Sequence, residues 1–232
     1  LLREIADSLW EVITKPGFTM GDKIYFDDFY TEVTKRENYT TYVKFSIPKE
    51  EFLKKIYQIG KTPLPPYIKT TTPETRLRRE YQTVYAKITG SAAAPTAGLH
   101  FTKKLLTKLK EKRVQTEFVT LHVGLGTFAP IKEDEIEKHK IHEEYFEIDE
   151  NTVNRLNQAK KQGKRIIAVG TTTSRALETL ANRKGILTTH LPAQAGHTLP
   201  TTNLFIYPPY KFKFVEALIT NFHLPKSTLL AL

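Results

Sequence analysis

Four short segments of the sequence combine small residues with hydroxyl groups and with a histidine or an arginine. They are AAAPTAGLHF at 92–101, LHVGLGTF at 121–128, VGTTTSR at 169–175 and TNFHLPKST at 220–228. Each segment follows or precedes a predicted strand. Ligands of α/β sheets bind beyond the carboxyl ends of the strands, so loops of this composition can converge on one crevice. The sequence therefore predicts one ligand site that is built from four distant parts of the chain.

The third of these segments has the chemistry of an anion site. Gly170 lets the chain bend sharply after a strand, and Thr171 to Ser174 then offer hydroxyls and free backbone N–H groups at a helix start. Such a start favours a carboxylate or a phosphate by roughly 0.3–1 kcal/mol. A plain strand-to-helix turn capped by threonine is the alternative, and the spacing is not that of a Walker loop. Gly124 and Gly126 are a weaker signal, because two glycines are common in a β-turn.

Imidazole and carboxylate groups in or near these segments could act as acids and bases. A positioned base typically contributes about 10²–10⁴ in rate. The candidates are His100, His122, His223, Glu143 and Glu144. For each histidine taken alone, a structural role between apolar neighbours is the alternative.

Other kinds of chemistry find no support in the residue types and their spacing. The chain has no cysteine, which excludes disulfides, thiolate catalysis and thiolate metal sites. His139 and His142 stand near two glutamates, but no His-Glu-x-x-His spacing occurs, so no metal is expected. No nucleophile elbow indicates acyl transfer.

The chain is strongly basic. It has 35 Lys and Arg residues against 25 Asp and Glu residues, which gives a net charge of +10. Such a surplus attracts polyanions and makes nucleic acid a candidate partner. Several of the lysines lie in TKKLLTKLKEKR at 102–113, a predicted helix. The alternative is a solvated lysine face behind an apolar stripe of Leu105, Leu106 and Leu109.

Length and hydropathy indicate a globular protein. The 232 residues suffice for one large or two modest domains. No apolar run approaches the roughly eighteen residues of a membrane span and no leader opens the chain, so we expect a cytoplasmic protein with no membrane partner. We also expect a monomer. Leu1 at the start and the apolar KSTLLAL at the end predict that the sequence is a fragment of a longer chain.

The first sixty residues are predicted to be rich in β-structure. Aromatic and β-branched residues favour strands at 9–14, 23–36 and 39–47. An amphipathic helix should follow between Pro48 and Gly60, with Phe52, Leu53, Ile56 and Tyr57 on one face. Three prolines in 61–69 then predict a stiff extended connector. We therefore expect a small β-barrel-like domain over 1–62 and a larger α/β domain over 63–232.

Helices and strands alternate in the second region, which is the pattern of an α/β domain. A helix is also expected directly after Gly170. The other expected helices span 73–87, 102–113 and 150–162, the strands span 117–123, 144–148, 164–169, 204–207 and 214–220, and a long loop spans 183–203. The fold class is therefore α/β: a mixed α/β domain with a smaller all-β, barrel-like domain.

Six motifs taken together resemble one known family. They are YQTVYAK, GSAAAPTAGLHFT, LHVGLGTF, IHEEYFEI, RIIAVGTTTSRALE and LITNFHLPKSTLL. In this order they resemble the S-adenosylmethionine:tRNA ribosyltransferase-isomerases of queuosine biosynthesis. The resemblance runs from residue 63 to the end of the sequence, and residues 1–60 resemble the small β-barrel domain of that family only loosely.

The resemblance implies an enzyme that acts on tRNA. In the family, the ribosyl part of S-adenosylmethionine, a co-substrate, is transferred to the pre-queuosine base at the wobble position and isomerised to an epoxycyclopentane. Adenine and methionine are released, and no metal is implied. The tRNA and the ribosyl donor are thus the expected partners. A sulfonium acidifies hydrogens on the neighbouring ribose carbon, so a base in a dry pocket could begin the rearrangement.

The candidate residues receive roles under this interpretation. Acid–base groups are expected from His100, His122 and His223 with Glu143 or Glu144. Donor contacts are expected from Thr96, Gly98, Gly124, Gly126, Thr171, Thr172 and Arg175. Lys226 and the lysine-rich helix should meet tRNA phosphates.

The sequence departs from the family pattern at some positions, and other functions stay open. Ala129 stands where the family usually has arginine, which removes a basic contact unless Arg175 or Lys226 supplies one. The family chain also normally extends beyond both ends of this sequence. A basic RNA-binding module without chemistry would bind RNA in a salt-sensitive way, whether or not the donor is present. A methyltransferase would use the same donor, but its glycine-rich first turn is not seen.

Overall fold

The chain forms two compact units. The computed structural model describes residues 1–232 except 2, 15–16, 38–39, 66–67, 89–90, 125–130, 132, 134, 140, 189–199, 224, 226 and 229–232. One unit comprises Leu1–Pro63 with Gly90–Ala92, and the other comprises Leu64–Thr89 with Ala93–Leu232. Each unit has its own cluster of buried apolar side chains.

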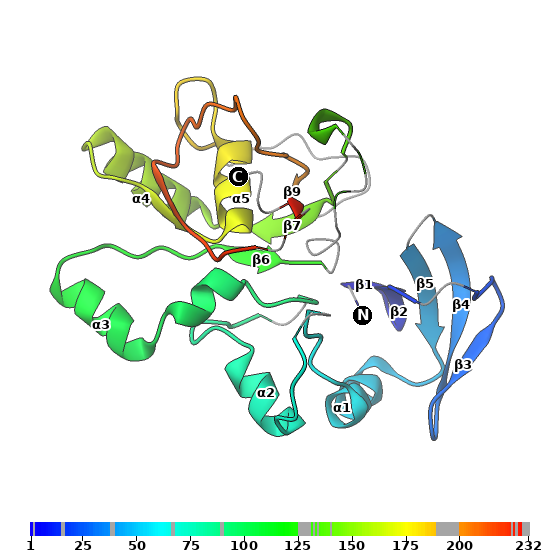
Figure 1. The fold of residues 1–232 in the computed structure, drawn as a ribbon. Coiled ribbons are helices and arrows are strands. Elements are labelled where there is room, and N and C mark those ends of the chain that lie inside the picture. The colour runs from blue at the N-terminus through cyan, green and yellow to red at the C-terminus, as the bar shows by residue number, and fades with distance from the viewer. Residues whose placement is uncertain are drawn as a thin grey trace. The chain divides into compact units, whose positions relative to one another are not determined.

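The small unit contains an antiparallel five-stranded sheet (Figure 1). The strand order is β1-β2-β5-β4-β3. The strands are β1 (Arg3–Ala6), β2 (Leu9–Val12), β3 (Lys23–Tyr25), β4 (Tyr30–Glu37) and β5 (Thr40–Phe45). Every second residue of β5 is buried, as expected of a sheet with one face on the core.

A single helix completes the core of this unit. Helix α1 (Lys49–Ile59) begins after Pro48 and ends at Gly60, as predicted. Phe52 is buried and its ring stacks on Phe45 at 3.8 Å between centroids. Tyr57 was expected on the same apolar face, but 73% of it is exposed. The helix therefore anchors to the sheet mainly through Phe52.

The expected barrel is not confirmed, because the described strands form an open sheet with β1 and β3 at its edges. Strand β1 was not predicted. The single strand expected over 23–36 is instead a hairpin, because the chain turns between Phe26 and Phe29, where the Phe26 N–H donates to the Phe29 carbonyl over 2.8 Å. The two acidic residues between them, Asp27 and Asp28, favour such a turn.

The larger unit is a mixed α/β assembly, in agreement with the predicted fold class. One sheet has the order β6-β7-β9, and a second pairs β10 with β8. The strands are β6 (Thr120–His122), β7 (Glu144–Glu147), β8 (Ile167–Val169), β9 (Thr201–Thr202) and β10 (Ala217–Ile219). The helices are α2 (Glu74–Glu80), α3 (Lys103–Glu111), α4 (Glu150–Lys161) and α5 (Thr171–Leu180), with 3₁₀ turns at Thr96–His100 and Ile136–Lys138.

Local sequence signals set most of these boundaries. The Asp149 side chain accepts the Thr152 N–H at 2.9 Å and caps α4, as predicted. The Thr152 hydroxyl first and the Thr152 N–H second lower the pKa of this carboxyl. By contrast, α2 ends at Glu80 rather than at 87. The Gln82 amide oxygen accepts the Thr83 N–H at 2.9 Å, a local bond that replaces a helical one.

A buried glutamate organises the segment that leads into β10. Glu178 of α5 is 1% exposed. Its carboxylate accepts hydrogen bonds from the Tyr210 hydroxyl at 3.0 Å and from the N–H groups of Lys213, Phe214 and Val215 at 2.8–2.9 Å. Burial, followed by the bond to Glu178, raises the pKa of Tyr210. Because these bonds engage the N–H groups of 213–215, the strand expected at 214–220 is shortened to β10. The strand expected at 204–207 is not formed.

Candidate functional site

Two of the four predicted segments leave the same end of a parallel strand pair. Strand β10 pairs with β8 in parallel, with Ile219 opposite Val169. The Gly170 N–H donates to the Ile219 carbonyl over 2.9 Å. Gly170 has φ +93°, a conformation that side chains rarely adopt, and the chain enters α5 directly after it. The segments after Val169 and after Ile219 therefore emerge side by side.

All four segments contribute to one small cavity. Its lining is Ala94, Pro95, Thr96, Ala97, Leu121, Val123, Gly170, Thr171, Thr172, Thr220 and His223. The predicted convergence is therefore present in the larger unit. Gly124 directly follows the lining residue Val123, whereas Gly126 and Lys226 lie outside the described residues. The volume is about 40 Å³, which is little more than the space of one water molecule. The described lining can thus hold one end of a donor-sized ligand.

Thr96 and His100 share a hydrogen-bonded partner from another segment. The Asn221 amide nitrogen donates to the Thr96 hydroxyl at 2.8 Å, and the Asn221 amide oxygen lies 2.7 Å from Nε2 of His100. These bonds join the first predicted segment to the fourth, across more than 120 residues of sequence. His100 is exposed, so its ring can also be reached by a ligand.

His223 lies in the cavity wall itself. Its Nε2 is 3.2 Å from the Thr220 hydroxyl. Burial lowers the pKa of His223 from its ordinary value of 6.5, because the charged imidazolium loses hydration. At neutral pH this ring is therefore uncharged and can accept a proton.

His122 faces away from the cavity. Its neighbours Leu121 and Val123 both line the cavity, and successive side chains of a strand point to opposite faces. Its Nε2 lies 3.0 Å from the Glu147 carboxylate on the neighbouring strand β7. The His122 ring is therefore directed toward Glu147, and His122 does not belong to the lining of the cavity.

Glu144 and Arg175 pair with each other rather than with a ligand. Their side chains are 1% and 3% exposed, and Arg175 Nη1 lies 2.5 Å from Glu144 Oε2. The guanidinium also donates to the carbonyls of Leu204, Thr202 and His142 at 2.7–3.2 Å. Burial lowers the pKa of Arg175, and the charge of Glu144 opposes this effect. Both side chains are therefore buried against each other, and neither belongs to the lining of the cavity.

Glu143 and Gly98 also make close contacts within the protein. The Glu143 carboxylate accepts the Thr201 hydroxyl at 2.6 Å. A side chain at Gly98 would collide with the hydroxyl of Tyr85 and would lie 2.9 Å from Thr83 Cγ2. The glycine is thus required by Tyr85, and no ligand is needed to explain it. Thr171 and Thr172, in contrast, line the cavity as expected.

Replacing Gly98 by alanine should destabilise the protein by about 1–3 kcal/mol, because the added methyl group forces Tyr85 out of its place. Urea unfolding measures the loss. Tyr85→Phe removes the atom that lies nearest to the new methyl group, so Gly98→Ala should cost less in a Tyr85→Phe background. Equal costs in the two backgrounds would contradict the packing argument.

Two residues of the fourth segment were not singled out from the sequence. Asn221 joins Thr96 to His100, and Phe222 is fully exposed beside it at 106%. An exposed aromatic ring offers a stacking surface to a nucleobase. The sequence feature that could have identified them is their position immediately before His223, a candidate base.

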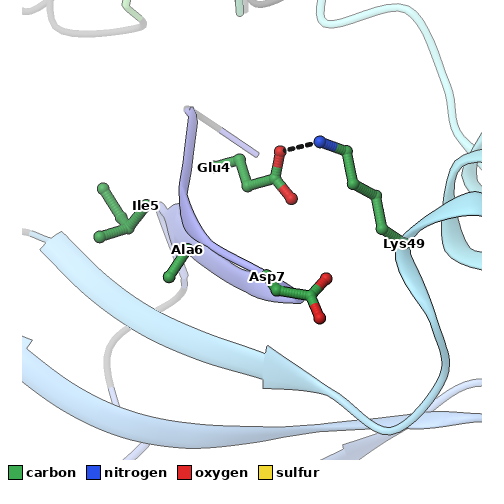
Figure 2. A pocket seen from close by; sticks show the side chains of 5 residues that line it. All are labelled: Glu4, Ile5, Ala6, Asp7 and Lys49. Atoms are coloured by element: carbon green, nitrogen blue, oxygen red, sulfur yellow. Dashed lines mark ion pairs between the residues drawn. The ribbon is translucent and has the colours of Figure 1, made fainter.

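A larger hollow lies in the small unit (Figure 2). Its volume is about 340 Å³. It is lined by Glu4, Ile5, Ala6, Asp7 and Lys49. Glu4 and Lys49 form an ion pair at 2.5 Å. The lining has no histidine and no hydroxyl group, so the cavity of the larger unit is the better candidate for chemistry despite its smaller size.

Metal ligands and membrane spans were also sought. Within the described part of the chain, no three His, Asp or Glu side chains are grouped as a metal site would require. Nor does any helix among those residues have the length and apolar character needed to cross a membrane.

The chain is similar to proteins of one family. A family model described as queuosine biosynthesis protein matches residues 1–232. Curated relatives from Thermotoga petrophila and Halothermothrix orenii are each 48% identical over 100% of this chain and 66% of their own length. A relative from Macrococcus caseolyticus is 46% identical over 97% of this chain and 64% of its own length. All three are named S-adenosylmethionine:tRNA ribosyltransferase-isomerase. The chain thus spans just under two thirds of the length of these relatives.

Proposed function

Because the chain belongs to the queuosine biosynthesis protein family, we propose that it transfers and isomerises the ribosyl group of S-adenosylmethionine onto the pre-queuosine base of tRNA. The products are the epoxyqueuosine base, adenine and methionine. The observation that supports this function best is the single cavity lined by all four glycine- and hydroxyl-bearing segments. His223 lines this cavity together with Thr171 and Thr172 at the N-terminus of α5, which supports a base and an anion-binding turn in one site.

The donor should enter the cavity with its carboxylate first. The N-terminus of α5 presents backbone N–H groups and the hydroxyls of Thr171 and Thr172 at the lining. A cavity of about 40 Å³ suits a carboxylate better than a nucleoside. The adenine then lies outside the cavity, where the exposed ring of Phe222 offers a stacking surface.

His223 and His100 provide the acid–base groups of this proposal. His223 is the base, because burial keeps its ring neutral at the pH of the cell. It accepts a proton from the ribose carbon next to the sulfonium. His100 is the second group: Nδ1 of its neutral ring takes up a proton within the site and then passes it to the departing adenine. This proposal assigns no catalytic role to Glu144, because its buried carboxylate pairs with Arg175. It does not use Glu143, whose carboxylate accepts the Thr201 hydroxyl.

Helix α3 is proposed to contact the phosphates of tRNA. Its cap is Thr102, whose hydroxyl accepts the Leu105 N–H at 3.1 Å. The lysines of the helix are all exposed. They are Lys103, Lys104, Lys108 and Lys110. Leu105 of the expected apolar stripe is itself 37% exposed, so the buried side of the helix is narrow and the basic side is wide.

Replacing Lys104 and Lys108 by glutamine should weaken RNA binding to the same extent whatever the sequence of the RNA. Each lost phosphate contact should reduce the slope of log K against log salt concentration by about 1. Filter binding over a series of salt concentrations measures both effects. Lys161→Gln, at an exposed lysine of α4, is the matched control and should leave the slope unchanged. An unchanged slope in the double variant would remove α3 from the RNA-binding surface.

Adenine release tests the proposed function directly. The protein is incubated with S-adenosylmethionine and with a tRNA that carries the pre-queuosine base, and free adenine is measured by chromatography. We expect adenine to appear only when the modified tRNA is present. Methylated RNA with S-adenosylhomocysteine would identify a methyltransferase instead. Salt-sensitive RNA binding without any turnover of the donor would identify a binding module.

A further inference from the structure

Asn221 is placed to determine which nitrogen of His100 carries a proton. Its amide group bridges two partners, Thr96 and His100, that come from the same 3₁₀ turn. A side-chain amide has a nitrogen that only donates hydrogen bonds and an oxygen that only accepts them. The orientation of the amide therefore determines which neighbour accepts a hydrogen bond from it and which neighbour donates one to it.

In the structure the amide is oriented with its nitrogen toward Thr96. The Asn221 nitrogen donates to the Thr96 hydroxyl at 2.8 Å, so the Asn221 oxygen faces His100. The distance from this oxygen to His100 Nε2 is 2.7 Å, which is a short hydrogen bond. Because the oxygen cannot donate, the proton in this bond belongs to Nε2. In a neutral imidazole the other nitrogen then holds a lone pair.

We infer that Asn221 is a positioning residue that holds neutral His100 with its proton on Nε2, so that Nδ1 is the atom that exchanges protons with the substrate. The inference rests on the proposed function for the role of His100 in catalysis, but the bond itself needs no substrate. Nδ1 makes no hydrogen bond to any residue in the described part of the chain, and the ring is exposed. Nδ1 is thus open to a ligand.

Nuclear magnetic resonance determines the tautomer of His100 in the protein without donor or RNA. Multiple-bond ¹⁵N–¹H correlation spectra distinguish the two neutral forms of each histidine ring, and His100→Gln identifies the signals of His100. We expect the Nε2–H form in the unmodified protein. A neutral ring protonated on Nδ1 would overturn the inference, whatever the activity of the protein.

Variants of Asn221 separate positioning from simple packing. Asn221→Asp keeps an acceptor opposite Nε2, so the Nε2–H form should persist. Asn221→Leu removes the acceptor at similar size, and the two tautomers should then mix. Thr96→Val removes the anchor of the amide and should also give a mixture. An Asn221→Leu protein that keeps a pure Nε2–H form would overturn the inference.

Adenine release then connects the tautomer to the reaction. Asn221→Leu should lower kcat about 10-fold to 100-fold, within the range that a positioned acid–base group contributes. Asn221→Asp should retain more activity than Asn221→Leu, because its His100 ring keeps the correct tautomer. Equal losses in the two variants would contradict a positioning role. If the unmodified protein releases no adenine, the proposed function fails, while the spectra still decide the tautomer.

Discussion

Replacing Arg175 by methionine should lower the free energy of unfolding by about 3–5 kcal/mol. The variant leaves the Glu144 carboxylate, 1% exposed, without the guanidinium that lies 2.5 Å from it. It also removes the donors to the Leu204, Thr202 and His142 carbonyls. Removing one partner of a buried pair costs more than the pair contributes, because the remaining charge is stranded away from water. Urea unfolding followed by circular dichroism measures the change.

Two further variants show whether burial is the cause. Arg155 forms an ion pair with Glu117 at 2.7 Å, but its side chain is 53% exposed. Arg155→Met is the matched control and should cost far less than Arg175→Met, because water screens an exposed ion pair. Replacing Glu144 by leucine in the Arg175→Met protein should recover part of the lost stability, because no stranded charge then remains. A similar small cost for Arg175→Met and Arg155→Met would contradict the structural role assigned to Arg175.

Replacing His223 by alanine should slow adenine release about 10²-fold to 10⁴-fold. The residue lies in the cavity wall, and burial favours the neutral ring that can accept a proton. Single-turnover measurements at saturating donor separate this step from binding. Circular dichroism and urea unfolding verify that the variant is folded.

The dependence of kcat/KM on pH tests the assignment of His223 as the base independently of the alanine variant. Below its pKa the His223 ring is protonated and cannot act as a base, so kcat/KM should rise with pH and then level off. Because burial lowers this pKa, the rise should be centred below pH 6.5. His122→Ala is the matched control: the His122 ring is turned toward Glu147, so we expect a much smaller loss of rate. An equal loss in the His122 and His223 variants would contradict the assignment of the base.

Features that depend on neighbouring residues were predictable from the sequence. The cap of α4 at Asp149 and the passage from β8 through Gly170 into α5 each need only a few consecutive residues. The meeting of the third and fourth segments was predictable too, because the carboxyl ends of the parallel strands β8 and β10 lie at one edge of a sheet. Thr172 and His223 follow these strands and line the cavity, whereas Thr96 reaches it from a 3₁₀ turn, a position that no strand pairing predicts.

Features that depend on long-range pairing were not predictable from one sequence. Glu144 and Arg175 both stood in promising motifs, and nothing local indicated that they pair across 31 residues. The orientation of His122 depends on the alternation of β6, which the sequence shows only once its exact strand is known. The bridge from Asn221 to Thr96 spans 125 residues. The barrel was an expectation from composition, and strand composition does not determine whether a sheet closes.

The parallel pairing of β8 with β10 has a consequence for how the site is made during translation. Residues 167–169 leave the ribosome long before residues 217–219, their partners in the sheet. The helix start at Thr171 is therefore synthesised early, but the wall that contains His223 arrives about fifty residues later. Domains fold as units during synthesis. A nascent chain stalled before β10 should hence contain the residues of α2 to α5 and yet lack the cavity.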